Sequence, residues 1–499
     1  MRSSRRTTGP APGHGRGDQL ARAAAQGGTA IFVGQVLRAV VQAASLVVLA
    51  RLLEPADFGL VAMVLVVVGI ADVLRDSGML NAAIQAPTLS KEQRDNLFWI
   101  NMLLGAVAAA VTVLAAPLVA HLYGESELTA ITRWLALTFL FNGIATQYRA
   151  SLLRRFEFTA TATIEVFAQV GGLTCAIVIA MAGGRYWALV AQSLTVAALI
   201  CVGSAVRASW IPGPVHFGVS VTSFLRYGIN MLAAGMVIQF SRTVDTLVVG
   251  LRFGPTSAGI YNRAFQFMSL PIQQLLHPAQ RVAVPILART QHDPQRFRRF
   301  LLRGHLVLLH CTMPVCALGA ALAFPIVEIV FGPGWNAAAP ILAALLVAGA
   351  FQIAGSAATW AFLTVGSTGS MLRLTLATRP LVIVAAVVAS AWSPFAVACA
   401  VAASWAAIWP ISIWWAKRTT PAPSGSLMVV GVRVLGAHGA AAIVAGLVAS
   451  RVAAEGPWLQ LAAGLAVAAA VAGVELAVWP ALRRDLALLS TVARLGFPR

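Results

Sequence analysis

Long apolar runs, separated by short polar segments, recur along this sequence between residues 29 and 480. Each run is about 20 residues long, which is the length of an α-helix that crosses the hydrocarbon core of a bilayer. The runs do not alternate apolar and polar residues as the strands of a membrane barrel do. The pattern therefore predicts an all-α polytopic membrane protein with fourteen transmembrane helices, at 29–50, 58–79, 97–120, 131–148, 161–182, 186–206, 223–250, 257–280, 304–328, 338–364, 374–393, 395–416, 429–450 and 458–480.

Composition strengthens this interpretation. Of the 499 residues, 59% are hydrophobic and 11% are charged, whereas roughly a quarter of the residues of soluble proteins are charged. So few charges do not cover the surface of a soluble protein of this length. Soluble enzymes, disordered proteins and soluble nucleic-acid binders are therefore excluded as classes.

The net charge of +19 sets the predicted orientation. Most Lys and Arg residues lie in short loops, where they anchor the chain to anionic lipid and keep the loops in the cytoplasm. With the N-terminus in the cytoplasm, 24 of them fall on the inner side, and the five on the outer side are Arg51, Arg133, Arg185, Arg252 and Arg451. We therefore expect both termini to be cytoplasmic and expect no nucleic-acid partner.

The chain also repeats itself at about 200 residues. Pro55 and Gly59 stand in the pattern P-x-x-x-G-L, and Pro255 and Gly259 stand in the pattern P-x-x-x-G-I. Residues 117–124 resemble residues 325–332 in the same way. Each repeat spans six predicted helices, so both copies have the same orientation in the membrane.

The repeat predicts two six-helix lobes that face each other across a central cavity, plus two C-terminal helices. Such lobes are the structural basis of alternating access, although a duplicated bundle can also be a scaffold. The expected divisions are a cytoplasmic tail (1–28), an N-lobe (29–207), a linker (208–222), a C-lobe (223–416), a second linker (417–428), the C-terminal helix pair (429–480) and a cytoplasmic tail (481–499).

Three stretches of the chain, residues 49–59, 76–101 and 241–294, resemble a known transporter family. They are similar to the polysaccharide transporter family of the multidrug/oligosaccharidyl-lipid/polysaccharide exporter superfamily, and most of all to its Wzx-type flippases. The likeness is specific over residues 30–310 and is only topological beyond about residue 340. It provides no residue pattern from which site residues can be transferred.

This resemblance implies a function in the bacterial cytoplasmic membrane. Members export polyprenyl-pyrophosphate-linked oligosaccharides to the outer leaflet for lipopolysaccharide, capsule or exopolysaccharide synthesis. The implied partners are the lipid-linked oligosaccharide, membrane lipids and polysaccharide assembly proteins. No cofactor is implied, and the energy source is left open between a proton gradient, a sodium gradient and substrate mass action.

Charged residues deep inside predicted spans are costly, so they mark candidate sites. Arg38, Arg242, Asp245 and Arg263 are the deepest, and Gln42 is the position that matches Arg242 in the first repeat. Guanidinium groups bind phosphate oxygens through paired hydrogen bonds. We therefore predict that these five residues line the substrate cavity. In the alternative interpretation, Arg242 and Asp245 form a structural ion pair, since they are three residues apart.

Two further acids lie in the inner half of the second span. Asp72 and Asp76 are one helical turn apart, with Arg75 between them. They are candidates for binding a coupling proton or sodium ion, and an interfacial ion-pair cluster is the alternative. Glu165 is expected near a cytoplasmic helix end, and Arg379 has no assigned role.

Motifs of enzymes and metal sites are absent from the sequence. It contains no P-loop, no HExxH and no GxSxG, and its five cysteines all lie in apolar runs without a CxxC pair. We therefore expect a protein that is not an enzyme and holds no metal. Separately, Asp293 and Pro294 begin a basic and aromatic stretch that predicts a short helix on the inner leaflet.

Other functions remain open at this point. A drug/cation antiporter and a peptidoglycan-precursor flippase have related architectures, but the three Arg residues and one Asp among the deepest charges favour an anionic substrate. A membrane-embedded glycan polymerase or glycosyltransferase is less compatible with short outer loops and an internal duplication.

The charge pattern makes a testable prediction about topology. Reporter fusions at Lys91, Arg299 and Lys417 should give cytoplasmic signals, and fusions at His121 and Gly332 should give external signals. One inverted position among the first twelve helices would contradict the two-lobe arrangement.

Overall fold

The computed structural model describes residues 14–76, 89–218, 222–485 and 487, and all regular structure in these residues is helical. The prediction of an all-α protein is confirmed. The helices are α1 (His14–Leu52), α2 (Pro55–Asp76), α4 (Lys91–Tyr123), α5 (Glu127–Arg154), α6 (Phe158–Met181), α7 (Trp187–Ala208), α8 (Thr222–Thr290), α9 (Pro294–Ala321), α10 (Ala323–Phe331), α11 (Ala338–Ala354), α12 (Ser356–Val365), α13 (Thr368–Ala389), α14 (Pro394–Thr419), α15 (Ser424–Arg451) and α16 (Pro457–Val478).

Twelve helical segments of the described chain are long and apolar enough to cross a membrane. The long helix α8 consists of two further helical segments, because its backbone leaves the helical conformation at Gly254, where φ is 77°. Pro255 follows directly and lacks the amide hydrogen that would continue the helix across this point. The two parts of α8 match the predicted spans 223–250 and 257–280, so each of the fourteen predicted spans has a counterpart.

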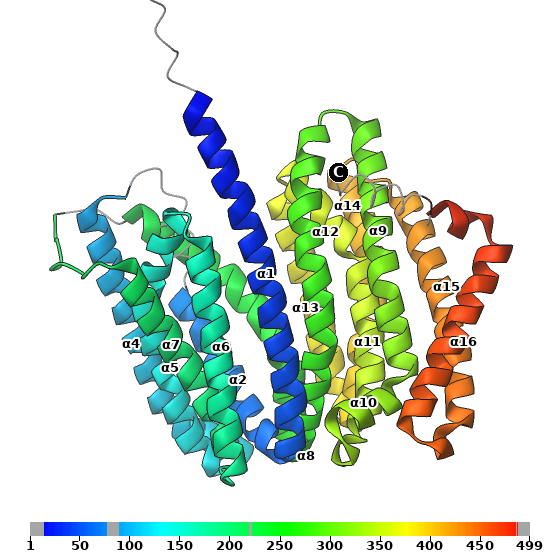
Figure 1. Cartoon of the computed structure of the whole chain (residues 1–499), viewed down its shortest axis with the longest axis horizontal. Helices are drawn as coiled ribbons and strands as arrows, with labels where there is room; N and C mark the ends of the chain where they lie inside the picture. The colour runs from blue at the N-terminus through cyan, green and yellow to red at the C-terminus, as the bar shows by residue number, and fades with distance from the viewer. Residues whose placement is uncertain (1–13, 77–88, 219–221, 486, 488–499) are drawn as a thin grey trace, which may run out of the picture.

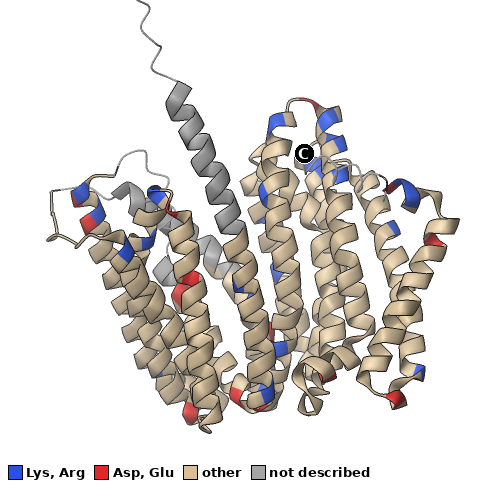
Figure 2. Cartoon of the chain, viewed as in Figure 1, with Lys and Arg blue, Asp and Glu red and all other residues tan. Residues whose placement is uncertain are grey.

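Figure 1 shows the helices standing side by side, with α4 to α7 at one edge and α15 and α16 at the other. The two predicted lobes meet where α2 packs against α8, and α15 joins the C-lobe by packing against α9. In Figure 2 the charged residues gather mainly at the two ends of the helices, with a largely uncharged band between them. This arrangement is the one that a bilayer requires of a multi-pass protein.

The prediction of a short helix on the inner leaflet, beginning at Asp293 and Pro294, is wrong. Asp293 caps a helix as expected, since its carboxylate accepts hydrogen bonds from the backbone N–H groups of Gln295 and Arg296. The helix does not stop after the basic stretch, however, and continues unbroken to Ala321. Phe297 and Leu301 are fully buried, so the basic stretch packs against the protein. It continues directly into the membrane-spanning part of the same helix.

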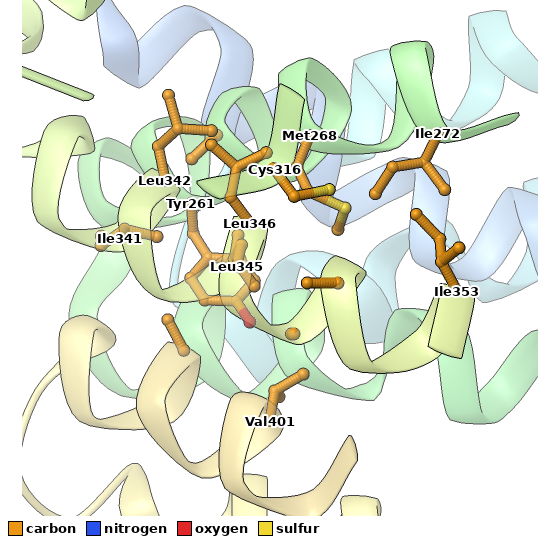
Figure 3. Packing of buried hydrophobic residues seen from close by; sticks show 14 of the residues in the cluster. Tyr261, Met268, Ile272, Cys316, Ile341, Leu342, Leu345, Leu346, Ile353 and Val401 are labelled. Atoms are coloured by element: carbon orange, nitrogen blue, oxygen red, sulfur yellow. The ribbon is translucent and has the colours of Figure 1, made fainter. Parts of the chain in front are cut away.

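The C-lobe has a dense apolar interior. Figure 3 shows Tyr261 and Met268 of α8 facing Cys316 of α9 and Leu345 of α11, with Val401 of α14 below them. All five side chains are buried. Dense packing of this kind makes the C-lobe rigid, so the residues that line its cavities keep their positions.

The backbones of the two lobes come into contact at the two glycines of the repeated motif. A Cβ atom on Gly59 would lie 1.7 Å from the carbonyl oxygen of Pro255, and a Cβ atom on Gly259 would lie 1.8 Å from that of Pro55. The contact is thus reciprocal between the two repeats, as a pseudo-two-fold axis requires. We call this contact the glycine crossing.

Further contacts across the lobes surround the glycine crossing. The indole N–H of Trp335 donates a hydrogen bond of 2.9 Å to the carbonyl of Ala50. The ring of Trp335 also meets Phe58 edge-on, with centroids 5.4 Å apart. The Arg51 guanidinium donates to the carbonyl of Val330 at 3.4 Å. The lobes are therefore joined tightly at this end of the helices, which the charge pattern predicts to be the outer end.

The glycine crossing can be tested by adding one methyl group. Gly59→Ala and Gly259→Ala should each destabilise the protein by at least about 1–3 kcal/mol, because the new Cβ overlaps a backbone oxygen that cannot turn away. Gly436→Ala on α15 is the matched control, since a Cβ there meets nothing within 4 Å. Thermal unfolding of the purified variants measures the effect, and equal midpoints for Gly59→Ala and Gly436→Ala would contradict the close approach.

Candidate substrate-binding cavities

A polar cavity of about 190 Å³ lies between the lobes, and we call it the inter-lobe cavity. Its walls come from α1, α2, α6 and α7 of the N-lobe and from the second part of α8. Amides and hydroxyls dominate its polar lining, contributed by Gln42, Ser45, Gln169, Gln192, Ser193, Asn262 and Gln266. Hydrogen-bonding groups of this kind, placed inside a membrane protein, suit a ligand that is rich in hydroxyls.

Arg263 is the one charged residue in the lining of the inter-lobe cavity. Its guanidinium lies over the ring of Phe58, 3.8 Å from the centroid, and donates a hydrogen bond of 3.0 Å to the side-chain oxygen Oε1 of Gln266. Its buried Nε has no hydrogen-bond partner among the described residues. The cavity therefore presents a positive charge without an acidic partner.

The other predicted residues are divided between this cavity and different surroundings. Gln42 lines the inter-lobe cavity together with Arg263. Arg38 instead forms an ion pair with Glu165 of α6, and Glu165 also accepts a hydrogen bond of 2.7 Å from Arg149 of α5. Two arginines thus share one carboxylate, so this network keeps a net positive charge.

Arg242 and Asp245 line cavities inside the C-lobe. Two cavities of about 160 and 280 Å³ share Arg242, Gln352, Arg379 and Trp405, and we call them together the C-lobe chamber. Asp245 accepts hydrogen bonds from the Tyr261 hydroxyl at 3.1 Å and from the backbone N–H of Thr246 at 2.8 Å. No ion pair joins Arg242 to Asp245, although the structure describes both side chains.

The candidate coupling acids lie apart from these cavities. Asp72 is half-buried in α2 and lines neither the inter-lobe cavity nor the C-lobe chamber. The side chains of Asp76 and Arg75 lie outside the described residues. Their predicted role in ion coupling stays a prediction.

The structure also has two large apolar cavities. One of about 500 Å³ lies between α1, α8, α9 and α16, and residues such as Ala43, Leu46, Phe267 and Leu465 line it. A second, of about 540 Å³, lies between α9, α11 and α15. Leu46 also lines the inter-lobe cavity, so a polar and an apolar cavity lie next to each other.

Sequence reasoning missed several polar residues of these cavities. Gln169, Gln192 and Asn262 were not singled out, although an uncharged amide in an apolar run is a visible signal. Arg379, which had no assigned role, lies in the C-lobe chamber. Arg433 pairs with Asp485 at 2.5 Å and joins α15 to the segment after α16.

No group of three or more His, Cys, Asp or Glu side chains that could hold a metal ion occurs in the part of the chain that the structure describes. His305 is buried, and neither of its ring nitrogens has a hydrogen-bond partner there. The cavities themselves offer amides, hydroxyls, unpaired arginines and apolar surface.

Known structures share this fold. The lipid II flippase MurJ in an inward closed conformation superposes with a TM-score of 0.70 at 13% sequence identity, covering 90% of this chain and 98% of that one. An inward-facing multidrug resistance MATE transporter of the MOP superfamily gives 0.56 at 14% identity, covering 80% and 94%. At such identities the likeness establishes the fold alone.

Sequence relatives are found among proteins of polysaccharide synthesis. The chain is 29% identical over 319 residues to the lipopolysaccharide biosynthesis protein WzxC of Escherichia coli (strain K12), covering 62% of this chain and 63% of that protein. It is 27% identical over 300 residues to the succinoglycan biosynthesis transport protein ExoT of Rhizobium meliloti (strain 1021), covering 60% of each. The chain thus matches less than two thirds of the length of these relatives.

A family match covers a larger continuous region than the three stretches identified from the sequence. Residues 48–340 match the family described as polysaccharide biosynthesis protein. The matched region runs from the end of α1 to the start of α11, and it includes the glycine crossing and the inter-lobe residues of α8. Because it exceeds half of the chain, the protein belongs to this polysaccharide biosynthesis family.

Proposed function

We propose that the protein carries a polyprenyl-pyrophosphate-linked oligosaccharide across the bacterial cytoplasmic membrane by alternating access. The observation that carries the proposal is the pairing of a polar, cationic cavity between the lobes with an apolar cavity beside it. A lipid-linked oligosaccharide has the same two parts, a charged and hydroxyl-rich head and a long apolar tail. Membership in the polysaccharide biosynthesis family supports this substrate class.

In the proposed complex the head binds in the inter-lobe cavity. Arg263 contacts a phosphate oxygen, because its guanidinium lacks an acidic partner and offers a buried, unused N–H. Gln42, Asn262 and Gln192 bind sugar hydroxyls. The Arg38 network, with its surplus positive charge, is a second proposed contact for the pyrophosphate.

The tail lies in the apolar cavity between α1, α8 and α16. Leu46 stands between the two cavities and lines both, so the head and the tail need not separate during transport. A cavity of about 500 Å³ accommodates only part of a polyprenyl chain, and the rest remains in the bilayer. This arrangement lets the tail stay in lipid while the head crosses between the lobes.

The proposed direction of transport is from the cytoplasm outward. We place the closed glycine crossing on the outer side, so that the head enters from the cytoplasm in this state. Release requires the crossing to separate while contacts form at the opposite end. Both termini are cytoplasmic in this proposal, and the protein acts without a catalytic step.

The related functions fit the cavities less well. A cation antiporter needs an acid in its binding cavity, and the lining of the inter-lobe cavity contains one arginine and no acid. A peptidoglycan-precursor flippase would share the pyrophosphate chemistry, and the family match argues for surface polysaccharide instead. A proton or sodium gradient is retained as the proposed energy source, with Asp72 and Asp76 as its candidate sites, and polysaccharide assembly proteins remain proposed partners.

The head-binding role of Arg263 can be tested by removing its charge. Arg263→Gln should lower the affinity for a lipid-linked oligosaccharide about 10- to 100-fold, because one charged hydrogen bond is worth about 1.5–3 kcal/mol. Arg263→Lys should restore part of the activity, since it keeps the charge but loses the planar fork. Proteoliposomes that report the leaflet of the labelled glycan measure transport.

The matched control for this test is Arg451→Gln, which removes an arginine exposed at the end of α15. This variant should transport at the wild-type rate. Wild-type transport by Arg263→Gln would remove Arg263 from the head site. Absence of glycan transport by the wild-type protein itself would overturn the proposed function.

The tail-binding role of the apolar cavity can be tested by filling it. Ala43→Trp should slow transport of substrates with a long polyprenyl chain and leave transport of short-chain analogues unchanged, because only the long chain needs the cavity. Val40→Trp is the control, since Val40 on the same helix is 59% exposed and lines neither apolar cavity. Equal slowing of both substrates would show that the indole disturbs the lobes rather than the tail.

A further inference from the structure

The C-lobe chamber contains two arginines that the head-binding site does not use. Arg242 projects from the first part of α8, and Arg379 projects from α13. Both line each of the two cavities that form the chamber, and their positive charges repel each other. Two like charges on the walls of one chamber, inside a membrane protein, require an explanation.

Neither arginine has an acidic partner in the described part of the chain. Among the described residues, the side chain of Arg242 takes part in no ion pair or hydrogen bond, and the only such contact of Arg379 is a cation–π contact, 5.1 Å from the centroid of Trp405. The one acid of the chamber, Asp245, is already held by Tyr261 and Thr246. The chamber therefore has a surplus of positive charge.

The remaining lining combines polar groups with apolar residues of the C-lobe core. Gln273, Gln352, Ser356, Thr375 and Thr378 add amides and hydroxyls to the walls. Several sides of the chamber thus offer hydrogen bonds, while the two guanidinium groups supply the charge. The combination is that of a site for a small anionic group attached to a hydroxyl-rich molecule.

We propose that the C-lobe chamber is an anion-binding site in which Arg242 and Arg379 together bind an acidic group, namely a carboxylate or phosphate carried by the transported glycan. The chamber borders the same part of α8 as the inter-lobe cavity: Phe265 and Ser269 line the chamber, whereas Asn262 and Gln266 line the inter-lobe cavity. The chamber and the inter-lobe cavity thus share this part of α8 as a wall. The origin of the anion rests on the proposed function, whereas the existence of the site does not.

The site can be tested on the purified full-length protein in nanodiscs of zwitterionic lipid. Glucuronate and glucose are suitable probes, since they share a sugar ring and differ in one carboxylate. At constant ionic strength, glucuronate should raise the unfolding midpoint by at least about 2 °C over glucose. In the double variant Arg242→Gln and Arg379→Gln, this difference should disappear.

The same variants separate the anion site from a structural ion pair. Each glutamine keeps hydrogen-bonding capacity but removes one of the two repelling charges, so the midpoint without anion should stay equal or rise. A structural pair between Arg242 and Asp245 predicts the opposite, a clear fall for Arg242→Gln. Arg451→Gln, which removes an exposed arginine at the end of α15, serves as the control, because it should keep the full glucuronate effect.

Inorganic phosphate and chloride distinguish the sources of the anion. An effect of glucuronate that depends on both arginines supports an acid on the glycan. An effect of phosphate or chloride alone, with the same dependence, supports the anion site but assigns it to a free anion. An anion effect that is equal in the wild-type protein and the double variant, or absent from both, overturns the site, and neither outcome affects the Arg263 transport test.

Discussion

The contact between two backbones at the glycine crossing determines how the two lobes can be arranged. Gly59 and Gly259 each lie against a carbonyl oxygen of the other repeat, with no room for even a Cβ atom. Larger residues would hold α2 and α8 apart and would open the end that Trp335 and Phe58 now cover. Because the lobes are pinned at this end, any space between them must lie further along the helices, and the inter-lobe cavity is found there.

Charges inside the membrane divide into those with a protein partner and those without one. Arg38 and Arg149 share Glu165, and Arg433 pairs with Asp485, so these arginines also stabilise helix packing. Arg263 and Arg379 lie over aromatic rings instead, an arrangement that orients a cation without cancelling its charge. An arginine that is oriented but not neutralised retains its full attraction for an anionic ligand.

Much of the fold could be predicted from the sequence, because helix length, loop charge and the internal repeat are each set by the bilayer. The fourteen spans and the repeated Pro55 and Pro255 motifs followed directly from pattern. The extent of α9 could not be predicted, because its basic stretch also has the pattern of a helix on the membrane surface. Only the burial of Phe297 shows that this stretch packs against protein.

The candidate site was predicted less completely. Gln42 and Arg263 could be identified from charge and repeat symmetry, and the structure brings them into one cavity. The partner of Arg38 could not be foreseen, since Glu165 lies 127 residues away and the sequence does not state which helices pack together. Likewise, the sequence does not show that Arg379 of α13 lines the same chamber as Arg242 of α8. Distances between helices, rather than residue types, were the missing information.

In the proposed transport cycle the ligand must favour one arrangement of the lobes over another, since a ligand that binds both equally shifts nothing. The crossing favours closure at one end whether or not substrate is present, because its contacts involve protein alone. Unpaired arginines supply the opposing influence, since an anion between α8 and its neighbours cancels a repulsion that the empty protein retains. In the proposed cycle, binding of an anion by Arg263, and by Arg242 and Arg379, would drive the separation of Gly59 from Gly259. A neutral glycan of the same size would occupy the cavities without that contribution, so the proposal makes charge on the substrate the property that couples binding to the movement of the lobes.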